Sequence, residues 1–154
     1  DKANNKRDTA LSKNWYQKSS PETITILKNN ISNYFRHTAV VKSNQKLWTT
    51  FKPYKKLLKD SHTPIKSWLE CNCRASNEYS DRKALAYAIN RYLNPFYEKF
   101  FCLKGVTLNE DAYALSELIQ WVFRSAIRNG EPIQIYIPSV RMRTLFQKWL
   151  NNEI

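Results

Sequence analysis

The chain has 154 residues, with 25 Lys and Arg against 13 Asp and Glu and a formal net charge of +12. This length suits one domain, and a composition that is 42% hydrophobic and 14% aromatic is too apolar for a disordered chain. Only two glycines are present, which excludes collagen-like sequences, glycine-rich linkers and a phosphate-binding loop.

The positive charge is concentrated in the first 60 residues. That part carries 13 Lys and Arg against 4 Asp and Glu, whereas residues 61–154 carry 12 against 9. A net charge of this size attracts polyanions over long range, and nucleic acid, either DNA or RNA, is the commonest such partner. The sequence has no apolar run near the roughly 18–20 residues of a membrane span. We therefore expect a nucleic-acid partner and no membrane.

The cysteines and histidines do not predict a disulfide framework or a metal site. Cys71, Cys73 and Cys102 are too few for a secreted disulfide scaffold, and the N-terminus lacks the apolar core of a signal peptide. His37 and His62 have no second ligand at metal-binding spacing. We expect reduced thiols, a cytoplasmic location and no metal.

Residues 1–20 are polar, basic and aperiodic, which predicts a flexible arm that becomes ordered only if Leu11, Trp15 and Tyr16 dock on the rest. We assign residues 21–154 to a single domain. Ser20, Pro21 and Glu22 are typical of a helix start, and apolar residues recur at helical spacing over 21–36. The short β-branched run at 38–41 suggests a strand.

The middle of the chain alternates between predicted strands and helices. The apolar run 47–51 indicates a buried strand, followed by a short basic helix after Pro53 and a second strand-like run over 65–71. Residues 72–80 are typical of a loop. Ser80 then precedes a predicted helix over 81–92, in which Leu85, Ala88, Ile89 and Tyr92 form an apolar stripe.

The last part contains the clearest signals. After Asn94 and Pro95, three phenylalanines predict a short, well-buried helix that ends at Gly105. A helix is predicted over 110–128, a strand over 133–137, and a helix from 139 to the end. Strands alternating with helices predict an α/β fold with a small, partly parallel sheet and flanking helices. A mostly helical domain is the alternative.

The predicted helix at 110–128 separates apolar from polar side chains. Its polar face holds Glu117, Gln120, Trp121, Arg124 and Arg128, and the helix contains no lysine. Arginine presents a planar fork that suits phosphate, which lysine does not. An ordinary salt-bridged surface that involves Glu117 is the alternative interpretation.

This segment resembles a helicase motif. The run from Gln120 through Arg124 to Arg128, followed by Asn-Gly and a strand, is similar to motif VI of superfamily-two helicases. The strand at 47–51 with its short helix resembles motif IV, and residues 68–77 resemble motif V. The resemblance covers about residues 45–140 and is to the C-terminal RecA-like lobe of a helicase of phage or mobile-element type.

The resemblance implies roles for five residues. Arg124 and Arg128 would act as arginine fingers on the γ-phosphate of ATP held mainly by another domain. Gln120 would touch the same nucleotide, while Arg74 and Asn77 would lie at the nucleotide and nucleic-acid edge of the sheet.

The sequence has no G-x-x-x-x-G-K-[ST] loop and no acidic DEAD-like motif for Mg²⁺. It therefore predicts at most half of an ATP-dependent helicase. ATP and Mg²⁺ would be bound only together with an N-terminal ATPase domain or a neighbouring subunit.

A basic segment at 42–59 interleaves lysines with aromatic residues. Lys46, Lys52, Lys55 and Lys56 are predicted to contact phosphates, whereas Trp48 is predicted to lie in the core, as is Phe51. The function that we expect is nucleic-acid binding, as the C-terminal module of a helicase- or translocase-like ATPase. The alternative is a non-enzymatic DNA-binding or protein-interaction factor in the replication or regulation of a mobile element.

Overall fold

The computed structural model describes residues 8–73 and 77–154 and contains a three-stranded parallel sheet in the order β1-β2-β3. The central strand β2 (Ala84–Tyr87) pairs with β1 (Lys46–Thr49) on one side and with β3 (Gln134–Tyr136) on the other. In this register Leu85 lies between Leu47 and Ile135. The predicted α/β fold with a small parallel sheet is confirmed, and the mostly helical alternative is wrong.

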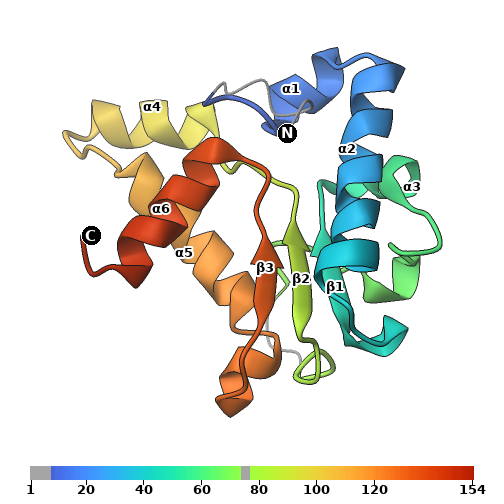
Figure 1. Cartoon of the computed structure of the whole chain (residues 1–154). Coiled ribbons are helices and arrows are strands. Elements are labelled where there is room, and N and C mark those ends of the chain that lie inside the picture. The colour runs from blue at the N-terminus through green and yellow to red at the C-terminus, as the bar shows by residue number, and fades with distance from the viewer. Residues whose placement is uncertain (1–7, 74–76) are drawn as a thin grey trace.

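In the part of the chain that the structure describes, six α-helices surround the sheet. They are α1 (Lys13–Lys18), α2 (Pro21–Asn33), α3 (Lys55–Leu58), α4 (Pro95–Leu103), α5 (Glu110–Val122) and α6 (Val140–Leu150). Figure 1 shows α2 and α3 on one face of the sheet, α5 and α6 on the other, and α1 and α4 above the carboxyl ends of the strands. α2, α5 and α6 begin at the capping side chains of Ser20, Asn109 and Ser139, each of which accepts a hydrogen bond from a backbone N–H in the first turn.

The strand β2 is covered on both faces, and this explains an error of prediction. Every residue from 84 to 90 is buried. Leu85 and Tyr87 pack in the core against α5 and α6, whereas Ala84 and Ala86 pack in the core on the α2 side. A parallel strand buried on both faces has no alternation of polar and apolar residues. The same apolar run fits a helical stripe, so the predicted helix over 81–92 is wrong.

Three other predicted elements differ from the structure. The chain continues from α2 into a π-helical turn at Tyr34–Thr38, and residues 39–41 form no strand. The predicted strand over 65–71 is reduced to a single parallel bridge between Trp68 and Trp48. The predicted helix over 110–128 ends at Val122, and a separate 3₁₀ turn follows at Ala126–Asn129.

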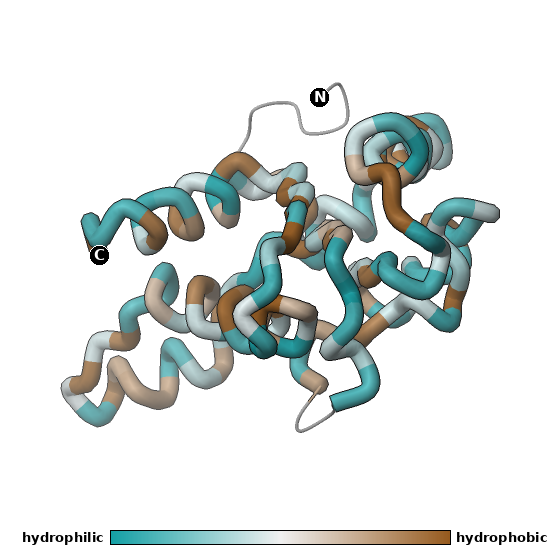
Figure 2. The backbone as a smooth tube through the Cα atoms, turned by 60° about the horizontal axis from the view of Figure 1, so that its bottom comes forward, coloured by the Kyte–Doolittle hydropathy of each residue, from teal (hydrophilic) through white to brown (hydrophobic). Residues whose placement is uncertain are grey.

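α6 closes the core on its side of the sheet. Its buried residues Met142, Leu145 and Phe146 recur at spacings of three and one, as expected for one face of a helix. Figure 2 shows the resulting alternation of polar and apolar patches along the helix that leads to the C-terminus. These side chains join Leu85 and Leu118 in one core cluster.

The N-terminal segment packs on the domain from residue 8 onward. Leu11 is fully buried, Tyr16 is 2% exposed, and Trp15 is half-buried. The arm was predicted to be ordered only if Leu11, Trp15 and Tyr16 dock on the rest of the chain, and the structure shows these three residues docked. The first seven residues of that arm lie outside the described part of the chain. We call residues 8–18 the N-terminal strap.

Candidate functional site

The path of the chain indicates which end of the parallel strands is the candidate binding site. After β1 the chain passes to the outer side of that strand, where the N–H of Leu69 donates to the carbonyl of Trp48 at 3.0 Å. It then crosses back to form β2 on the opposite side of β1. Open α/β sheets bind ligands outside the carboxyl ends of their strands, at such a reversal of direction. The carboxyl ends of β1 and β2 are therefore the expected site.

The N-terminal strap covers the centre of this edge. The hydroxyl of Tyr16 donates to the carbonyl of Ala88 at 2.7 Å and accepts from the hydroxyl of Thr50 at 3.0 Å. The N–H of Asn90 donates to the carbonyl of Leu11 at 2.9 Å. Burial raises the pKa of Tyr16 well above its usual range. The polar groups at the ends of β1 and β2 are thus occupied by the protein's own chain.

Asn90, which follows β2, joins the strap to the two helices on the other side. Its side-chain nitrogen donates to the carbonyls of Ala10, at 2.9 Å, and Asp8. Its side-chain oxygen accepts from Nη1 of Arg141 at 3.0 Å. The same guanidinium binds Asp111 on α5 through Nε at 3.0 Å and Nη2 at 2.6 Å. The amide of Asn90 therefore fixes the strap, α5 and α6 relative to one another.

Leu11 has a left-handed backbone conformation, with φ of 64°. A non-glycine residue pays about 1–2 kcal/mol for this conformation because its Cβ approaches the following carbonyl. Such strain persists only where the surroundings impose it. Here the buried leucine side chain and the bond from Asn90 to the Leu11 carbonyl do so.

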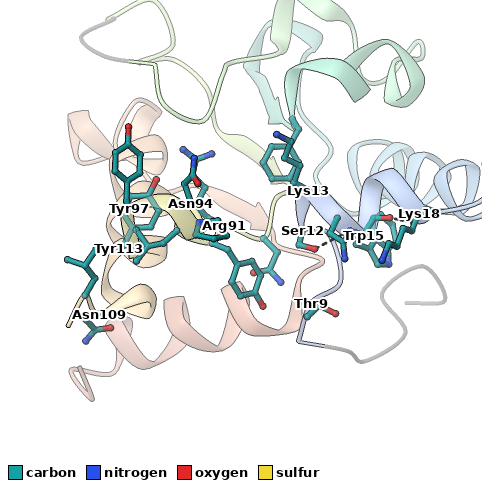
Figure 3. A pocket seen from close by; sticks show the side chains of 18 of the residues that line it. Thr9, Ser12, Lys13, Trp15, Lys18, Arg91, Asn94, Tyr97, Asn109 and Tyr113 are labelled. Carbon is teal, nitrogen blue, oxygen red and sulfur yellow. Dashed lines mark hydrogen bonds between the residues drawn. The ribbon is translucent and has the colours of Figure 1, made fainter. Parts of the chain in front are cut away.

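A cleft of about 1310 Å³ lies between the strap and the segment that follows β2. We call it the carboxyl-edge cleft. Figure 3 shows Lys13, Trp15 and Lys18 on the strap side, and Arg91, Tyr97 and Tyr113 on the opposite side. Its described lining contains three cations and six aromatic side chains but no Asp, Glu, His or Cys; the cations are Lys13, Lys18 and Arg91, and the aromatic residues are Trp15, Phe51, Tyr92, Tyr97, Phe101 and Tyr113.

Arg91 connects this cleft to the core. Its guanidinium lies 3.5 Å from the carboxylate of Glu117 and 5.9 Å from the ring centre of Tyr113. Burial alone would lower the pKa of Arg91, but Cys71, Tyr113 and Glu117 outweigh it and raise this pKa. The guanidinium therefore stays charged at the inner wall of the cleft. The thiol of Cys71 is buried, and burial raises its pKa, so it is not an activated nucleophile.

The helicase-like residues lie at the opposite edge of the sheet. The N–H of Ala126 donates to the carbonyl of Arg82, just before β2, and Figure 1 shows the segment that follows α5 below the amino ends of the strands. Nη1 of Arg128 donates to Oδ1 of Asn77 at 2.5 Å, which brings together two residues of the predicted nucleotide site.

The other members of that predicted site are placed separately. Gln120 is exposed in the last turn of α5, and Arg124 is half-buried in the turn after it, so Arg124 and Arg128 do not share a helix. Arg74 lies outside the described residues. Trp121, which was predicted on the polar face, is 2% exposed and donates through Nε1 to the carbonyl of Leu69 at 3.3 Å.

The predicted phosphate-binding lysines differ in exposure. Lys46 is 7% exposed in β1, with its ammonium 5.6 Å from the ring centre of Phe35, and burial lowers its pKa. It is therefore withdrawn from the surface. Lys55 is half-buried, with its ammonium 4.5 Å from the ring centre of Trp68. Lys52 and Lys56 are exposed. Trp48 is fully buried as predicted, whereas Phe51 is only half-buried and borders the carboxyl-edge cleft.

Sequence reasoning missed Lys13, Lys18, Asn90 and Arg91. The two lysines fell in the predicted arm, and the other two fell inside the predicted helix over 81–92. If residues 84–89 are assigned to a strand, Asn90 and Arg91 are predicted at its carboxyl end, because polar residues directly after a buried parallel strand lie there.

The described residues contain neither a cluster of metal ligands nor a membrane-spanning helix. No group of three or more His, Cys, Asp or Glu side chains within residues 8–73 and 77–154 is placed to hold a metal ion. None of the helices in this part of the chain has the length and apolar content that crossing a bilayer requires.

The family described as the YonV C-terminal Rossmann-like domain matches residues 1–150. A similar protein is the SPbeta prophage-derived uncharacterized protein YonV of Bacillus subtilis (strain 168), which is 52% identical over 145 residues. The match covers 94% of this chain but 35% of that protein, so the chain spans about a third of the length of the curated relative. No solved structure gives a significant match.

These matches agree with the predicted phage origin and with the observed parallel sheet. The relative is encoded by a prophage, and the family is described as Rossmann-like. The chain belongs to the family of YonV C-terminal Rossmann-like domains.

Proposed function

We propose that this domain binds nucleic acid in the carboxyl-edge cleft, with Lys13 and Lys18 facing the phosphates. The observation that carries this proposal is the composition of the cleft, where cations and flat aromatic rings occur together and no carboxylate is among the described lining residues. Lysines provide salt-sensitive contacts to phosphates, and aromatic rings stack on bases. An anionic ligand that contains flat rings fits both features.

The size of the cleft supports a polymer rather than a small molecule. Its volume of about 1310 Å³ exceeds the roughly 300–1,000 Å³ of most small-molecule sites. The described lining offers no histidine, thiol or carboxylate that could act as a general base or hold a metal. The proposal is therefore one of binding and not of catalysis at this site.

Two exposed lysines allow a direct test. Fluorescence anisotropy with a labelled oligonucleotide, repeated over a series of salt concentrations, compares the parent with Lys13→Gln/Lys18→Gln. We expect the double variant to bind about 10-fold to 100-fold more weakly. The slope of its log affinity against log salt concentration should be smaller by about two units, because each contact between a lysine and a phosphate contributes about one unit to that slope. Lys148→Gln, an exposed charge change at the far end of α6, is the matched control and keeps the parent's slope. Unchanged affinity and slope in the double variant would contradict the proposal.

The hydrogen bond between Arg128 and Asn77 supports a second candidate function at the opposite edge. In that proposal the chain is the C-terminal lobe of a helicase-like ATPase, and Arg124 and Arg128 reach the γ-phosphate of ATP bound by a partner domain or subunit. The partner would then hold ATP and Mg²⁺. We expect no ATP turnover by this chain alone in the presence of single-stranded DNA, and robust turnover by the chain alone would refute this assignment.

A further inference from the structure

The helix α4 directs an apolar surface to solvent. All nine of its residues are exposed, and the exposed fraction reaches 70% at Phe96 and 47% at Phe100. Sequence analysis predicted a well-buried helix here, and that prediction is wrong, because α4 adds no side chain to either core cluster. Contiguous apolar surface on a soluble domain marks an interaction site. The rings of α4 are therefore available to a ligand.

The aromatic residues of α4 are arranged in two adjacent columns. Phe96 and Phe100 are four residues apart, and so are Tyr97 and Phe101, which places each pair on the same side of the helix. Between the columns the rings meet edge to face, at 76° for Phe96 and Tyr97 and at 86° for Phe100 and Phe101. In an edge-to-face pair the ring that presents its edge keeps both of its faces free of its partner.

Positive charge borders these rings. Lys104 is the residue that ends α4, four positions after Phe100, and Lys99 lies next to Phe100 in the chain. Both lysines are exposed, and the ion pairs found within the described residues involve other cations. Aromatic rings flanked by cations are the pattern of surfaces that bind single-stranded nucleic acid.

One of the two columns lies in the carboxyl-edge cleft and the other lies beside it. Tyr97 and Phe101 line it, whereas Phe96 and Phe100 stand outside. Figure 1 shows α4 above the sheet and extending away from α1. A nucleic-acid strand that leaves the cleft on this side would therefore meet α4. If one base lies beside Tyr97, the next base of the same nucleic-acid strand would lie next to Phe96 and Phe100.

We infer that α4 is a stacking platform for the unpaired bases of a single-stranded nucleic acid whose phosphates bind in the carboxyl-edge cleft. This inference rests on the proposed function and adds a preference for single strands. In a duplex each base face is covered by its neighbours, so a double strand offers no free face to the α4 rings. A single strand exposes every base face, and stacking on a protein ring is tolerant of sequence.

The test separates contacts with bases from contacts with the backbone. Labelled oligothymidylate of about 20 nucleotides, a backbone strand of the same length without bases, and a duplex are titrated with the protein in anisotropy measurements. The test variant Phe96→Leu/Phe100→Leu keeps apolar surface and loses the rings. The control variant Leu103→Ala/Val106→Ala removes exposed aliphatic surface from the same region.

We expect the parent to bind oligothymidylate more tightly than the base-free strand and the duplex. The phenylalanine variant should lose about tenfold in affinity for oligothymidylate, since stacking is worth about 1–3 kcal/mol per base. Its affinity for the base-free strand should not change, because Lys13 and Lys18 are intact. The control variant should match the parent with all three ligands.

Each contrary outcome has a distinct meaning. Equal binding of oligothymidylate and the base-free strand by the parent would overturn the platform and leave only the binding of phosphates by Lys13 and Lys18. Equal losses in the phenylalanine and control variants would indicate a general apolar docking surface, for example for a protein, and would also overturn it. Failure of the parent to bind either strand would overturn the proposed function itself.

Discussion

Nη1 of Arg141 donates a hydrogen bond of 3.0 Å to the side-chain oxygen of Asn90, which ties the first turn of α6 to the end of β2. The same atom donates to the carbonyl of Arg91 at 2.7 Å, and the guanidinium lies 4.3 Å from the ring centre of Tyr92. Asn90 itself is 1% exposed. The site is thus organised by one buried amide, whose two ends bind the N-terminal strap and Arg141.

Replacing this amide should release the strap. Asn90→Ala removes the side-chain donor to the carbonyl of Ala10 and leaves Nη1 of Arg141 with only the carbonyl of Arg91, so we expect the free energy of unfolding to fall by about 2–3 kcal/mol. Limited proteolysis under native conditions should gain a cleavage site within residues 8–18. Asn14→Ala, an exposed change on α1, is the control. A variant with parental stability and no new cleavage would show that the strap is held by other contacts.

The carboxylate of Asp60, in the turn after α3, should make the free energy of unfolding depend on pH. Burial alone would raise the pKa of Asp60, but hydrogen bonds from Ser32, His62 and Thr63 outweigh it and hold this pKa below its usual value. A carboxylate with a lowered folded-state pKa contributes stability above its unfolded pKa of about 4 and loses it as the pH falls through the folded pKa. We expect Asp60→Asn to cost about 1 kcal/mol at neutral pH and progressively less below about pH 4. Urea unfolding over a pH series measures this, and a difference that does not depend on pH would contradict it.

The hydroxyl of Tyr87 should be dispensable. It is buried without a hydrogen-bond partner among the described residues, while its ring meets that of Trp121 at 5.3 Å. A buried polar group without a partner costs free energy, so Tyr87→Phe should leave stability unchanged or raise it by about 1 kcal/mol. The midpoints of thermal unfolding of the parent and of Tyr87→Phe test this expectation. A clear loss of stability would reveal a partner for this hydroxyl.

The lysines of β1 and of the segment that follows it should contribute unequally to nucleic-acid binding. Lys46 is buried, so Lys46→Met should leave oligonucleotide affinity at the parental value, because its ammonium cannot reach a phosphate. Lys52 and Lys56 are exposed in the segment that follows β1 and do not line the cleft, so Lys52→Gln/Lys56→Gln should weaken binding by less than about tenfold. Anisotropy titrations at one salt concentration compare the three proteins. A larger loss from Lys46→Met with retained stability would refute this ranking.

The fold class was predictable because it depends on local signals that agree. The capping residues Ser20, Asn109 and Ser139 mark helix starts correctly; the apolar run at 47–51 covers all of β1 except its first residue, and the run at 133–137 contains β3. β2 was not predictable from periodicity, because a strand covered on both faces is apolar at every position. The helix α4 fits its predicted position but not its predicted burial. Apolar content indicates a tendency to be covered and does not tell whether a core lies beside the helix.

The candidate site was less predictable, because its parts are distant in sequence. Lys13 and Arg91 line the same cleft although 78 positions separate them, and no local pattern relates the two. The pairing of Asn77 with Arg128 was within reach, since the helicase resemblance placed both in one site and the structure joins them by a hydrogen bond. Whether that edge meets a nucleotide stays a prediction.

Because α4 contributes no side chain to either core cluster, its residues can change during evolution with little effect on the stability of the domain. Most mutations lower stability, and selection removes those that bring a protein below the stability threshold for function. In α4 a side chain can be exchanged without a cavity, a strained rotamer or an unpaired polar group elsewhere in the protein. A prophage protein built on this domain can therefore acquire a new binding preference through one helix, and no compensating mutation is required in the rest of the fold.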